Sequence, residues 1–239
     1  MTRILAIDTS TAWCSVALSL DDDAPLFRHE LVATGASQLL LPWVEEVLSE
    51  ANVKLAELDA IAIGIGPGAF TGVRLGVAVV QGLAVSNALP VLPIVSLDAV
   101  AAQLSHTYSF EHAKPKNFVI ALDARMDEIY WAKYEATRNL PVRVGKIHLS
   151  KPEEINFLDI EFLAGSALKT YGERLMSSMT QKLPSSSLDA EIHINALGIL
   201  EYAQQMWSMG QQCHVRDLEP LYIRNKVALT TQERLEAFK

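Results

Sequence analysis

Apolar and polar positions follow the same order twice along this chain. Residues 4–8 form a short apolar segment that ends in Asp8, and a polar turn separates them from the alternating residues 13–18. In the second half, the apolar residues 118–123 end in Asp123 and precede the alternating residues 129–132. Short apolar runs and strict alternation are both typical of β-strands. We therefore predict a pair of strands at the start of each half.

The segments that follow these pairs also correspond between the halves. We predict third strands near residues 26–31 and 142–149, helices at 37–51, 70–89, 151–156 and 166–179, and strands at 60–65 and 160–164. Two copies of strand-strand-strand-helix-strand-helix indicate an α/β protein with two lobes, each a mixed sheet covered by helices. A polar stretch at 105–116 sets the predicted boundary. The division is an N-terminal lobe 1–105, a smaller C-terminal lobe 106–215 and a tail 216–239.

The helix predicted at residues 70–89 is unusual because it carries a single charged residue, Arg74. It has two apolar stripes on different sides, one of Val73, Val77, Val80 and Ala84 and the other of Leu75, Val79 and Gly82. A surface helix normally has one apolar stripe, which faces the core. We expect the first stripe to face the sheet and the second to meet a partner.

Glycines concentrate at the start of this helix, in residues 64–76. A glycine-rich turn between a strand and a helix is typical of phosphate-binding loops, but this run lacks Gly-Lys-Ser/Thr and the Gly-x-Gly-x-x-Gly spacing. Gly72 and Gly76 lie four residues apart on one helical face, where the missing side chains allow another helix to approach. The pattern favours close packing over ligand binding, and the ligand alternative stays open.

The helix predicted at residues 37–51 has an ordinary amphipathic pattern. Its apolar positions are Leu40, Leu41, Val44, Val47 and Leu48, and its polar side carries Glu45, Glu46 and Glu50. Proline fits without cost only in the first helical turn, so the helix starts near Leu41 or kinks at Pro42. This helix is either a simple cover for the sheet or part of an interface, and its nearness in sequence to residues 70–89 supports the second interpretation.

Composition limits the classes of protein. The chain has 239 residues, 50% of them hydrophobic, and a net charge of −8. Half-apolar composition is enough to bury a full core, whereas the acidic balance argues against a broad basic face for RNA. We expect any contact with RNA to be local or made through a partner. Because we find no signal-peptide pattern and no uninterrupted spanning segment, we predict a cytoplasmic protein without membrane contact.

Cysteine and histidine usage predicts no metal site. The two cysteines, Cys14 and Cys213, lie far apart, so neither a disulfide framework nor a thiolate site is indicated. The histidines are His29, His106, His112, His148, His193 and His214. None of them forms a pair at the helical spacing that two metal ligands would need.

The two strand-ending aspartates resemble those of actin-like ATPases and sugar kinases, which hold magnesium and phosphates between two lobes. Close approach of backbone to phosphate favours glycine in the turns after these strands. The turns at residues 8–12 and 123–127 contain no glycine, and residues 163–168 have one glycine where the kinases use a pair. All three nucleotide elements are therefore degraded, and we expect no cofactor. Asp8, Ser10 and Asp123 remain weak candidates, with turn capping as the alternative for Asp8.

Five stretches together resemble one bacterial family. They are residues 4–18, 66–82, 93–99, 123–130 and 220–224, the last reading Pro-Leu-Tyr-Ile-Arg. This combination is similar to the TsaB (YeaZ) family and extends over nearly the whole chain. The resemblance implies a two-lobed actin-like ATPase fold of the ribonuclease H-like type. It also implies a role in making N6-threonylcarbamoyladenosine at position 37 of tRNAs that read codons beginning with A.

The resemblance further implies a non-catalytic scaffold subunit. Members of the family pair with the catalytic TsaD subunit and the ATPase TsaE, reach tRNA only through the complex, and form homodimers through the same surface when TsaD is absent. The helices that match 37–51 and 70–89 form that surface. The interface residues we expect are Leu40, Val44, Val47, Gly72, Arg74, Leu75, Gly76, Val79 and Gly82.

Two other function classes compete with the scaffold. A free-standing ATPase or small-molecule kinase is disfavoured by the turns without glycine. A metallopeptidase, suggested by the glycoprotease label in this superfamily, lacks ligands, because the catalytic relative has histidines where this chain has Leu97 and Ala101. Ser10, Ser15 and Ser96 show no nucleophile pattern, so we predict that the chain is not an enzyme. Arg74 and Arg224 either contact tRNA or make local bonds.

Overall fold

The computed structural model describes residues 2–20, 24–32, 35–155, 157–177, 179 and 182–224. The first lobe is built on β1 (Arg3–Asp8), β2 (Trp13–Leu20), β3 (Leu26–Leu31), β4 (Ala60–Gly64) and β5 (Val91–Ile94), in the order β3-β2-β1-β4-β5. β1 pairs antiparallel with β2 and parallel with β4. Nearly all of β1 is buried because both faces of the sheet are covered. This double burial explains why the segment is apolar without alternation.

The second lobe repeats this sheet. Its strands are β6 (Asn117–Asp123), β7 (Ile129–Glu135), β8 (Val142–Ser150), β9 (Phe162–Ala164) and β10 (Leu188–Asp189), in the order β8-β7-β6-β9-β10. β6 corresponds to β1, since it also pairs antiparallel with the next strand and parallel with β9. The predicted duplication and the two-lobed α/β fold are confirmed.

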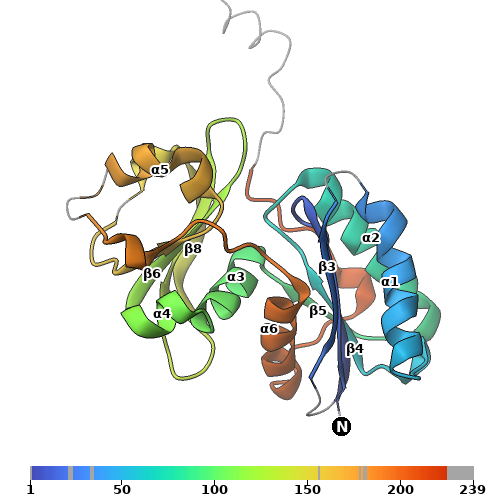
Figure 1. Ribbon diagram of the computed structural model, residues 1–239. Coiled ribbons are helices and arrows are strands. Elements are labelled where there is room, and N and C mark those ends of the chain that lie inside the picture. Colours follow the sequence, from blue (N-terminus) through green and yellow to red (C-terminus); the bar gives the residue numbers. More distant parts are fainter. Residues whose placement is uncertain are drawn as a thin grey trace, which may run out of the picture.

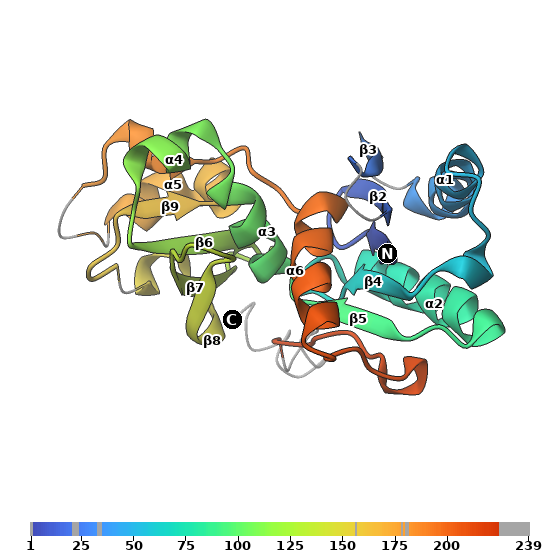
Figure 2. The same ribbon diagram turned by 90° about the horizontal axis from the view of Figure 1, so that it is seen from below.

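Helices lie on both faces of each sheet. α1 (Ala36–Glu50) and α2 (Phe70–Asn87) cover the outer face of the first sheet, and α5 (Ala167–Ser177) covers that of the second. α3 (Ser96–Ser105) and α6 (Ala196–Ser208) lie between the sheets, as the two views show (Figures 1 and 2). The order of layers is therefore helix, sheet, helix pair, sheet, helix.

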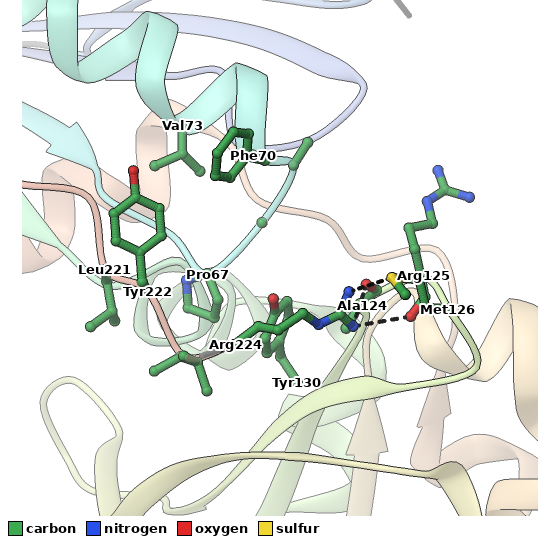
Figure 3. Close-up of a pocket in the computed structure, with 13 residues that line it drawn as sticks. Pro67, Phe70, Val73, Ala124, Arg125, Met126, Tyr130, Leu221, Tyr222 and Arg224 are labelled. Atoms are coloured by element: carbon green, nitrogen blue, oxygen red, sulfur yellow. Dashed lines mark hydrogen bonds between the residues drawn. The ribbon is translucent and has the colours of Figure 1, made fainter. Parts of the chain in front are cut away.

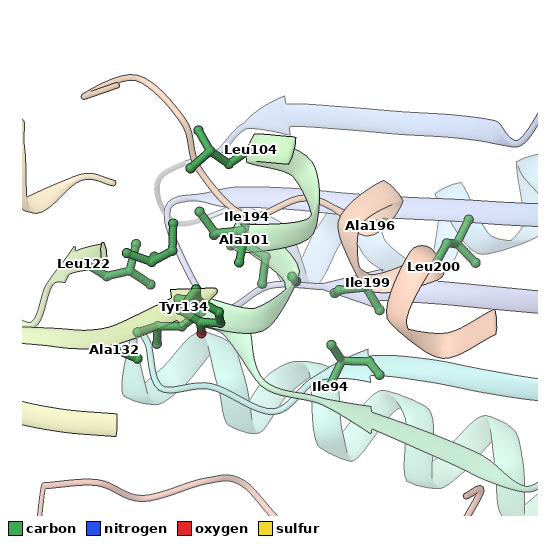
Figure 4. Packing of buried hydrophobic residues seen from close by; sticks show 14 of the residues in the cluster. Ile94, Ala101, Leu104, Leu122, Ala132, Tyr134, Ile194, Ala196, Ile199 and Leu200 are labelled. Carbon is green, nitrogen blue, oxygen red and sulfur yellow. The ribbon is translucent and has the colours of Figure 1, made fainter. Parts of the chain in front are cut away.

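The central helix pair joins the lobes through one shared core. This core contains Ile4 from the first sheet and Phe118 from the second. Figure 4 shows Ile94 of the first sheet, Tyr134 of the second and Ile199 of α6 in the same core. α6 follows the second sheet in the chain but packs against β1, β2, β4 and β5 of the first. A lobe defined as residues 106–215 places α6 with the wrong sheet. The physical reason is that α6 buries its apolar face across the interlobe layer, a contact that sequence order does not report.

Three predicted elements differ in detail. The helix predicted at residues 151–156 is replaced by a short 3-10 turn at Pro152–Glu154, and residue 156 lies outside the described part of the chain. The predicted boundary 105–116 contains α4 (Tyr108–Ala113), which begins where the Thr107 hydroxyl accepts a hydrogen bond from the Phe110 N–H. α1 begins at Ala36, well before Leu41, and Pro42 lies inside it on the exposed side. Apolar packing of the turns on either side keeps this helix continuous in spite of the missing proline N–H.

Residues 215–224 run from the first lobe to the second. A 3-10 turn at Val215–Asp217 contacts α2, and the Leu221 N–H donates to the Ile65 carbonyl at 2.8 Å. Arg224 then reaches the β6–β7 turn of the second lobe. The predicted tail 216–239 is thus a strap between lobes up to Arg224, and its remaining residues lie outside the described part of the chain. Within that described part, no helix combines the length and apolarity needed to cross a membrane.

Candidate partner-binding site

The first apolar stripe of α2 is part of the monomer core. Val73, Val77, Val80 and Ala84 are all buried against the sheet, with Val77 only 4% exposed. These residues point toward β4, β1 and the apolar side of α1. The prediction that this stripe faces the sheet is confirmed.

The second stripe of α2 reaches solvent. Leu75 and Val79 are half-buried, and Gly82 is exposed, so that a Cβ atom added there would meet nothing within 4 Å. Val85 continues this face one turn further and is 66% exposed. The outward face therefore has no charge beyond Arg74 and leaves apolar side chains partly exposed in the single chain. Exposed apolar side chains that lie together are a feature of interaction surfaces.

Gly72 and Gly76 serve a contact inside the chain. A Cβ atom at Gly72 would overlap the Thr9 carbonyl oxygen, and one at Gly76 would lie 2.8 Å from the Thr9 hydroxyl. The Thr9 hydroxyl also donates to the Gly72 carbonyl at 2.7 Å. The expectation that these glycines admit another helix is wrong at this face. They allow α2 to approach the turn after β1.

Three interface residues predicted on α1 are buried in the monomer. Leu40, Val44 and Val47 are at most 2% exposed and pack on the sheet, so they cannot meet a partner without unfolding α1. Their helical spacing identified an apolar stripe correctly, and the sheet already covers that stripe. The apolar residue that α1 presents to solvent is Leu41, whose side is otherwise polar.

Arg74 is held by two aromatic rings at the first turn of α2. Its guanidinium lies 3.6 Å from the centroid of the Phe70 ring, and its Nε donates to the Tyr222 hydroxyl at 2.7 Å. Tyr222 comes from the strap. Arg74 was expected either to contact tRNA or to make a local bond. The structure shows the local bond, which joins α2 to the C-terminal segment.

The first degraded phosphate turn is filled by protein. The Ala69 N–H at the start of α2 donates to the Ser10 carbonyl at 2.6 Å, so the helix N-terminus is occupied by the chain itself. Ser10 is buried, and its hydroxyl accepts a hydrogen bond from Ser96 at 3.3 Å. A phosphate would need these donors free. The glycine-rich run therefore packs on the turn, as the packing interpretation predicts.

Asp8 is the most unusual ionisable group in this turn. It is fully buried, one carboxylate oxygen accepts the Ser10 N–H at 3.2 Å, and the other has no hydrogen-bond partner. Gly64 leaves the space for this carboxylate, since a Cβ there would overlap it. Burial raises the pKa of Asp8 to about 7, against the smaller lowering effect of its bonds to Ser10. Asp8 both ends β1 and caps the turn.

The second turn is likewise closed by side chains. The Asp123 carboxylate accepts the Arg125 N–H at 2.8 Å and the Tyr171 hydroxyl at 3.3 Å. A Cβ at Gly165 would overlap the Ala121 carbonyl, so the single glycine of the late segment allows β6 and the loop before α5 to pack closely. Asp8, Ser10 and Asp123 thus have local structural partners. No described side chains form a group of three or more that could hold a metal ion.

The remaining sequence candidates are structural. Leu97 and Ala101, at the positions of the relative's histidines, are fully buried in the interlobe core. Cys14 and Cys213 are free thiols. The Arg224 guanidinium donates to the Ala124 carbonyl at 3.1 Å and to the Glu128 carboxylate at 2.6 Å.

Two clusters were not found from the sequence. One is the group of Phe70, Arg74 and Tyr222 just described. The other is a stack of Trp13 on His29 and His193, which are 164 residues apart. Each joins segments from distant parts of the chain, so periodicity carries no signal for it. The one sequence signal for the first cluster was that Tyr222 lies within the motif at residues 220–224.

Comparisons with known proteins agree with this architecture. A family model described as TsaD, tRNA N6-adenosine threonylcarbamoyltransferase, matches residues 30–233. The chain is 35% identical over 236 residues to the tRNA threonylcarbamoyladenosine biosynthesis protein TsaB of Haemophilus influenzae, with 94% of each chain covered. It is 32% identical over 228 residues to TsaB of Escherichia coli, with coverage of 95% and 96%.

A solved structure supports the same assignment. YeaZ from Pseudomonas aeruginosa superposes with a TM-score of 0.81 at 36% sequence identity, covering 93% of this chain and 100% of that one. The match therefore includes both lobes and the helix pair between them. With the family model and the two relatives above, it shows that this chain belongs to the TsaD-type domain family and, within it, to the TsaB (YeaZ) family.

Proposed function

We propose that this chain is a non-catalytic scaffold subunit in tRNA threonylcarbamoyladenosine biosynthesis and pairs with the catalytic TsaD subunit through the outward face of α2. The observation that carries the proposal is the second apolar stripe, formed by Leu75, Val79 and Gly82, which the described chain leaves partly exposed at Leu75 and Val79 and open at Gly82. The names of the relatives supply the pathway.

The physics of this face favours protein pairing. It is apolar, its one charge belongs to the locally bound Arg74, and Gly82 leaves a gap that a partner side chain or helix can fill. Burial of apolar surface contributes about 25 cal/mol per Å², so contact with a second apolar helix is favourable. Because the family model that matches this chain describes the transferase itself, partner and chain share one fold. Two like helices can then face each other, in a heterodimer or in a homodimer.

The non-catalytic part of the proposal rests on the degraded turns. Ser10 accepts the donor at the α2 N-terminus, and Asp8 is buried with its pKa raised to about 7. Asp8 is out of reach of a magnesium phosphate because it is fully buried, and the Ser10 carbonyl is already bonded to Ala69. We assign ATP hydrolysis to a separate TsaE subunit and tRNA positioning to the assembled complex. A cytoplasmic location fits that role.

The decisive experiment compares two substitutions on the same helix. Val79→Glu puts a carboxylate on the outward face, where the half-buried position keeps it partly hydrated in the monomer and pairing would desolvate it fully. A buried, uncompensated charge costs several kcal/mol, and a loss of about 3 kcal/mol weakens association by about two orders of magnitude. Val77→Glu is the matched control, because Val77 is buried in the monomer and its replacement should unfold the lobe.

Three readouts separate the outcomes. Thermal melting reports folding, mass in solution with and without TsaD reports pairing, and threonylcarbamoylation of a tRNA transcript in the reconstituted system reports function. We expect Val79→Glu to melt like the wild type while it loses pairing and activity. If Val79→Glu still pairs and supports activity, or melts as early as Val77→Glu, this face is ordinary structure and the proposal is wrong.

A further inference from the structure

A small pocket lies where the two lobes meet the C-terminal strap. Its volume is ≈ 200 Å³, and its walls come from the loop before α2, the β6–β7 turn and residues 221–224 (Figure 3). Sites for whole small molecules typically occupy about 300–1,000 Å³, so this one fits a single planar ring. Neither the turn at residues 8–12 nor Gly165 lines it. The second degraded turn does line it, through Ala124, Arg125 and Met126, so the pocket shares one wall with the degraded nucleotide elements.

Aromatic side chains form much of the wall. Phe70 and Tyr222 lie with ring centroids 6.1 Å apart and planes tilted by 41°. Tyr130, which is nearly buried, lines the opposite side together with Pro67. In Figure 3 the rings of Phe70 and Tyr130 lie on two sides of the same space. Such walls bind a flat π-system by stacking, whichever ring it is.

The charged groups on the pocket are all cations. Arg125 and Arg224 line it, and no Asp or Glu does so among the described residues. The Arg125 side chain is 85% exposed and has only a 3.6 Å contact with Asp123. In a chain of net charge −8, a local rim of arginine favours an anionic ligand.

Arg224 carries an unsatisfied donor. Its Nε is buried and has no hydrogen-bond partner, although Nη2 donates to the Ala124 and Arg125 carbonyls and the Glu128 carboxylate, and Nη1 to the Met126 Sδ. A buried donor left unpaired costs about 1–3 kcal/mol, and more when it is charged. A ligand acceptor would remove that cost once the guanidinium turns toward the pocket, because the Nε atom is closed to solvent in this structure.

The turn that presents Arg125 is held in a costly conformation. Arg125, Met126 and Asp127 all have left-handed backbones, with φ of 60°, 56° and 62°. This region is uncommon for residues other than glycine, and such strain concentrates at functional sites. Arg224 holds the turn from the strap side, and Arg174 binds Asp127 from α5. Together they fix Arg125 and Met126 at the pocket mouth.

We propose that this pocket takes one unstacked base of a single-stranded RNA segment, with the neighbouring phosphate on Arg125. A planar ring attached to an anion matches both the aromatic walls and the arginine rim. The choice of RNA rests on the proposed role in tRNA modification, in which the substrate base lies in a loop. A free nucleotide has the same chemistry, so the experiment must separate the two sources.

The test uses the full chain without partners, so its result does not depend on pairing with TsaD. The probe is a short, fluorescein-labelled single-stranded RNA with an anticodon-loop sequence, followed by anisotropy over a range of salt concentrations. We expect Phe70→Ala to weaken binding about tenfold and leave the salt dependence unchanged, because stacking contributes about 1–3 kcal/mol per base. We expect Arg125→Glu to weaken binding and lower the slope of log K against log salt by about 0.7, the value for one lost phosphate contact.

Matched controls decide the outcome. Arg138→Glu makes the same charge change in the β7–β8 connection, at the far end of β7 from the pocket, and Tyr108→Ala removes an exposed ring on α4. Both should bind like the wild type. The proposal is overturned if Arg125→Glu and Arg138→Glu weaken RNA binding equally. It is also overturned if free AMP binds as tightly as the RNA and displaces it, or if an acidic phenylalanine-containing peptide binds in the pocket and RNA does not. Val79→Glu should retain RNA binding, which separates this proposal from the pairing proposal.

Discussion

The imidazole rings of His29 and His193 lie edge to edge, with their Nε2 atoms 2.8 Å apart and their planes within 11° of parallel. The Nδ1 of His193 is 2.8 Å from the Glu191 carbonyl, which can only accept, so that nitrogen carries a proton. In the neutral pair, His193 Nε2 therefore accepts a hydrogen bond from His29. This bond joins β3 of the first lobe to the segment that enters α6.

The histidine pair predicts a loss of stability in acid. Burial, with a smaller effect from His193, lowers the pKa of His29 to about 4, whereas the unfolded value is near 6.5. Between about pH 4 and about pH 6.5 the unfolded chain binds more protons than the folded chain. The contribution of His29 to the free energy of unfolding is therefore complete above about pH 6.5 and is lost as the pH falls toward about 4. We expect His29→Gln, which stays neutral and can still donate, to reduce the decline in melting temperature between about pH 7 and about pH 5. His112→Gln, at an exposed position, is the control. An unchanged decline in the His29 variant would contradict the assignment.

The buried Asp8 should make the stability of the fold depend on pH in the opposite direction. Its folded pKa is raised to about 7, so the folded chain holds a proton that the unfolded chain has released above about pH 4. Stability from this group therefore falls as the pH rises from about 4 to about 7. We expect Asp8→Asn to raise the free energy of unfolding by at least about 1 kcal/mol at about pH 8. Urea unfolding at several pH values measures it. A destabilised Asn variant at high pH would show that the ionised carboxylate is needed.

Two glycines on α2 should respond in opposite directions to alanine. A methyl group at Gly72 overlaps the Thr9 carbonyl, and we expect Gly72→Ala to destabilise the chain by about 1–3 kcal/mol or more. Gly82→Ala meets no atom within 4 Å and should stabilise the helix by about 0.5–1 kcal/mol. Melting of the two variants tests this directly. Equal effects would mean that α2 does not rest on the turn after β1 as described.

The closed turns predict that the isolated chain hydrolyses ATP no faster than a buffer control and binds no stoichiometric zinc or iron. Asp8 is fully buried, Ser10 and Ala69 bond to each other, and Asp123 is bonded to Arg125 and Tyr171, so neither turn presents an accessible, unbonded carboxylate to a magnesium ion. Phosphate release and elemental analysis are the measurements. One tightly held ion per chain that disappears on mutation of Asp8 or Asp123 would contradict this prediction.

The duplicated sheets could be predicted because their signal is local. β1 and β6 are buried on both faces, so each appears as an apolar run, and the aspartate at its end marks the turn. The two stripes of α2 were also evident, since helical periodicity reports which sides of a helix are apolar. Periodicity does not report what covers each side, which is why Leu40 and Val44 on α1 were assigned to an interface although the sheet covers them.

The sequence by itself determined the two α/β lobes, the degraded nucleotide turns and the resemblance to one family, since each depends on residues close together in the chain. Only the tertiary structure decided that α6 packs on the first sheet, that Gly72 faces Thr9, and that the strap brings Arg224 to the β6–β7 turn. These contacts join segments far apart in the chain. Their energies come from burial and steric fit between surfaces, and a linear pattern does not contain the distance between two such surfaces.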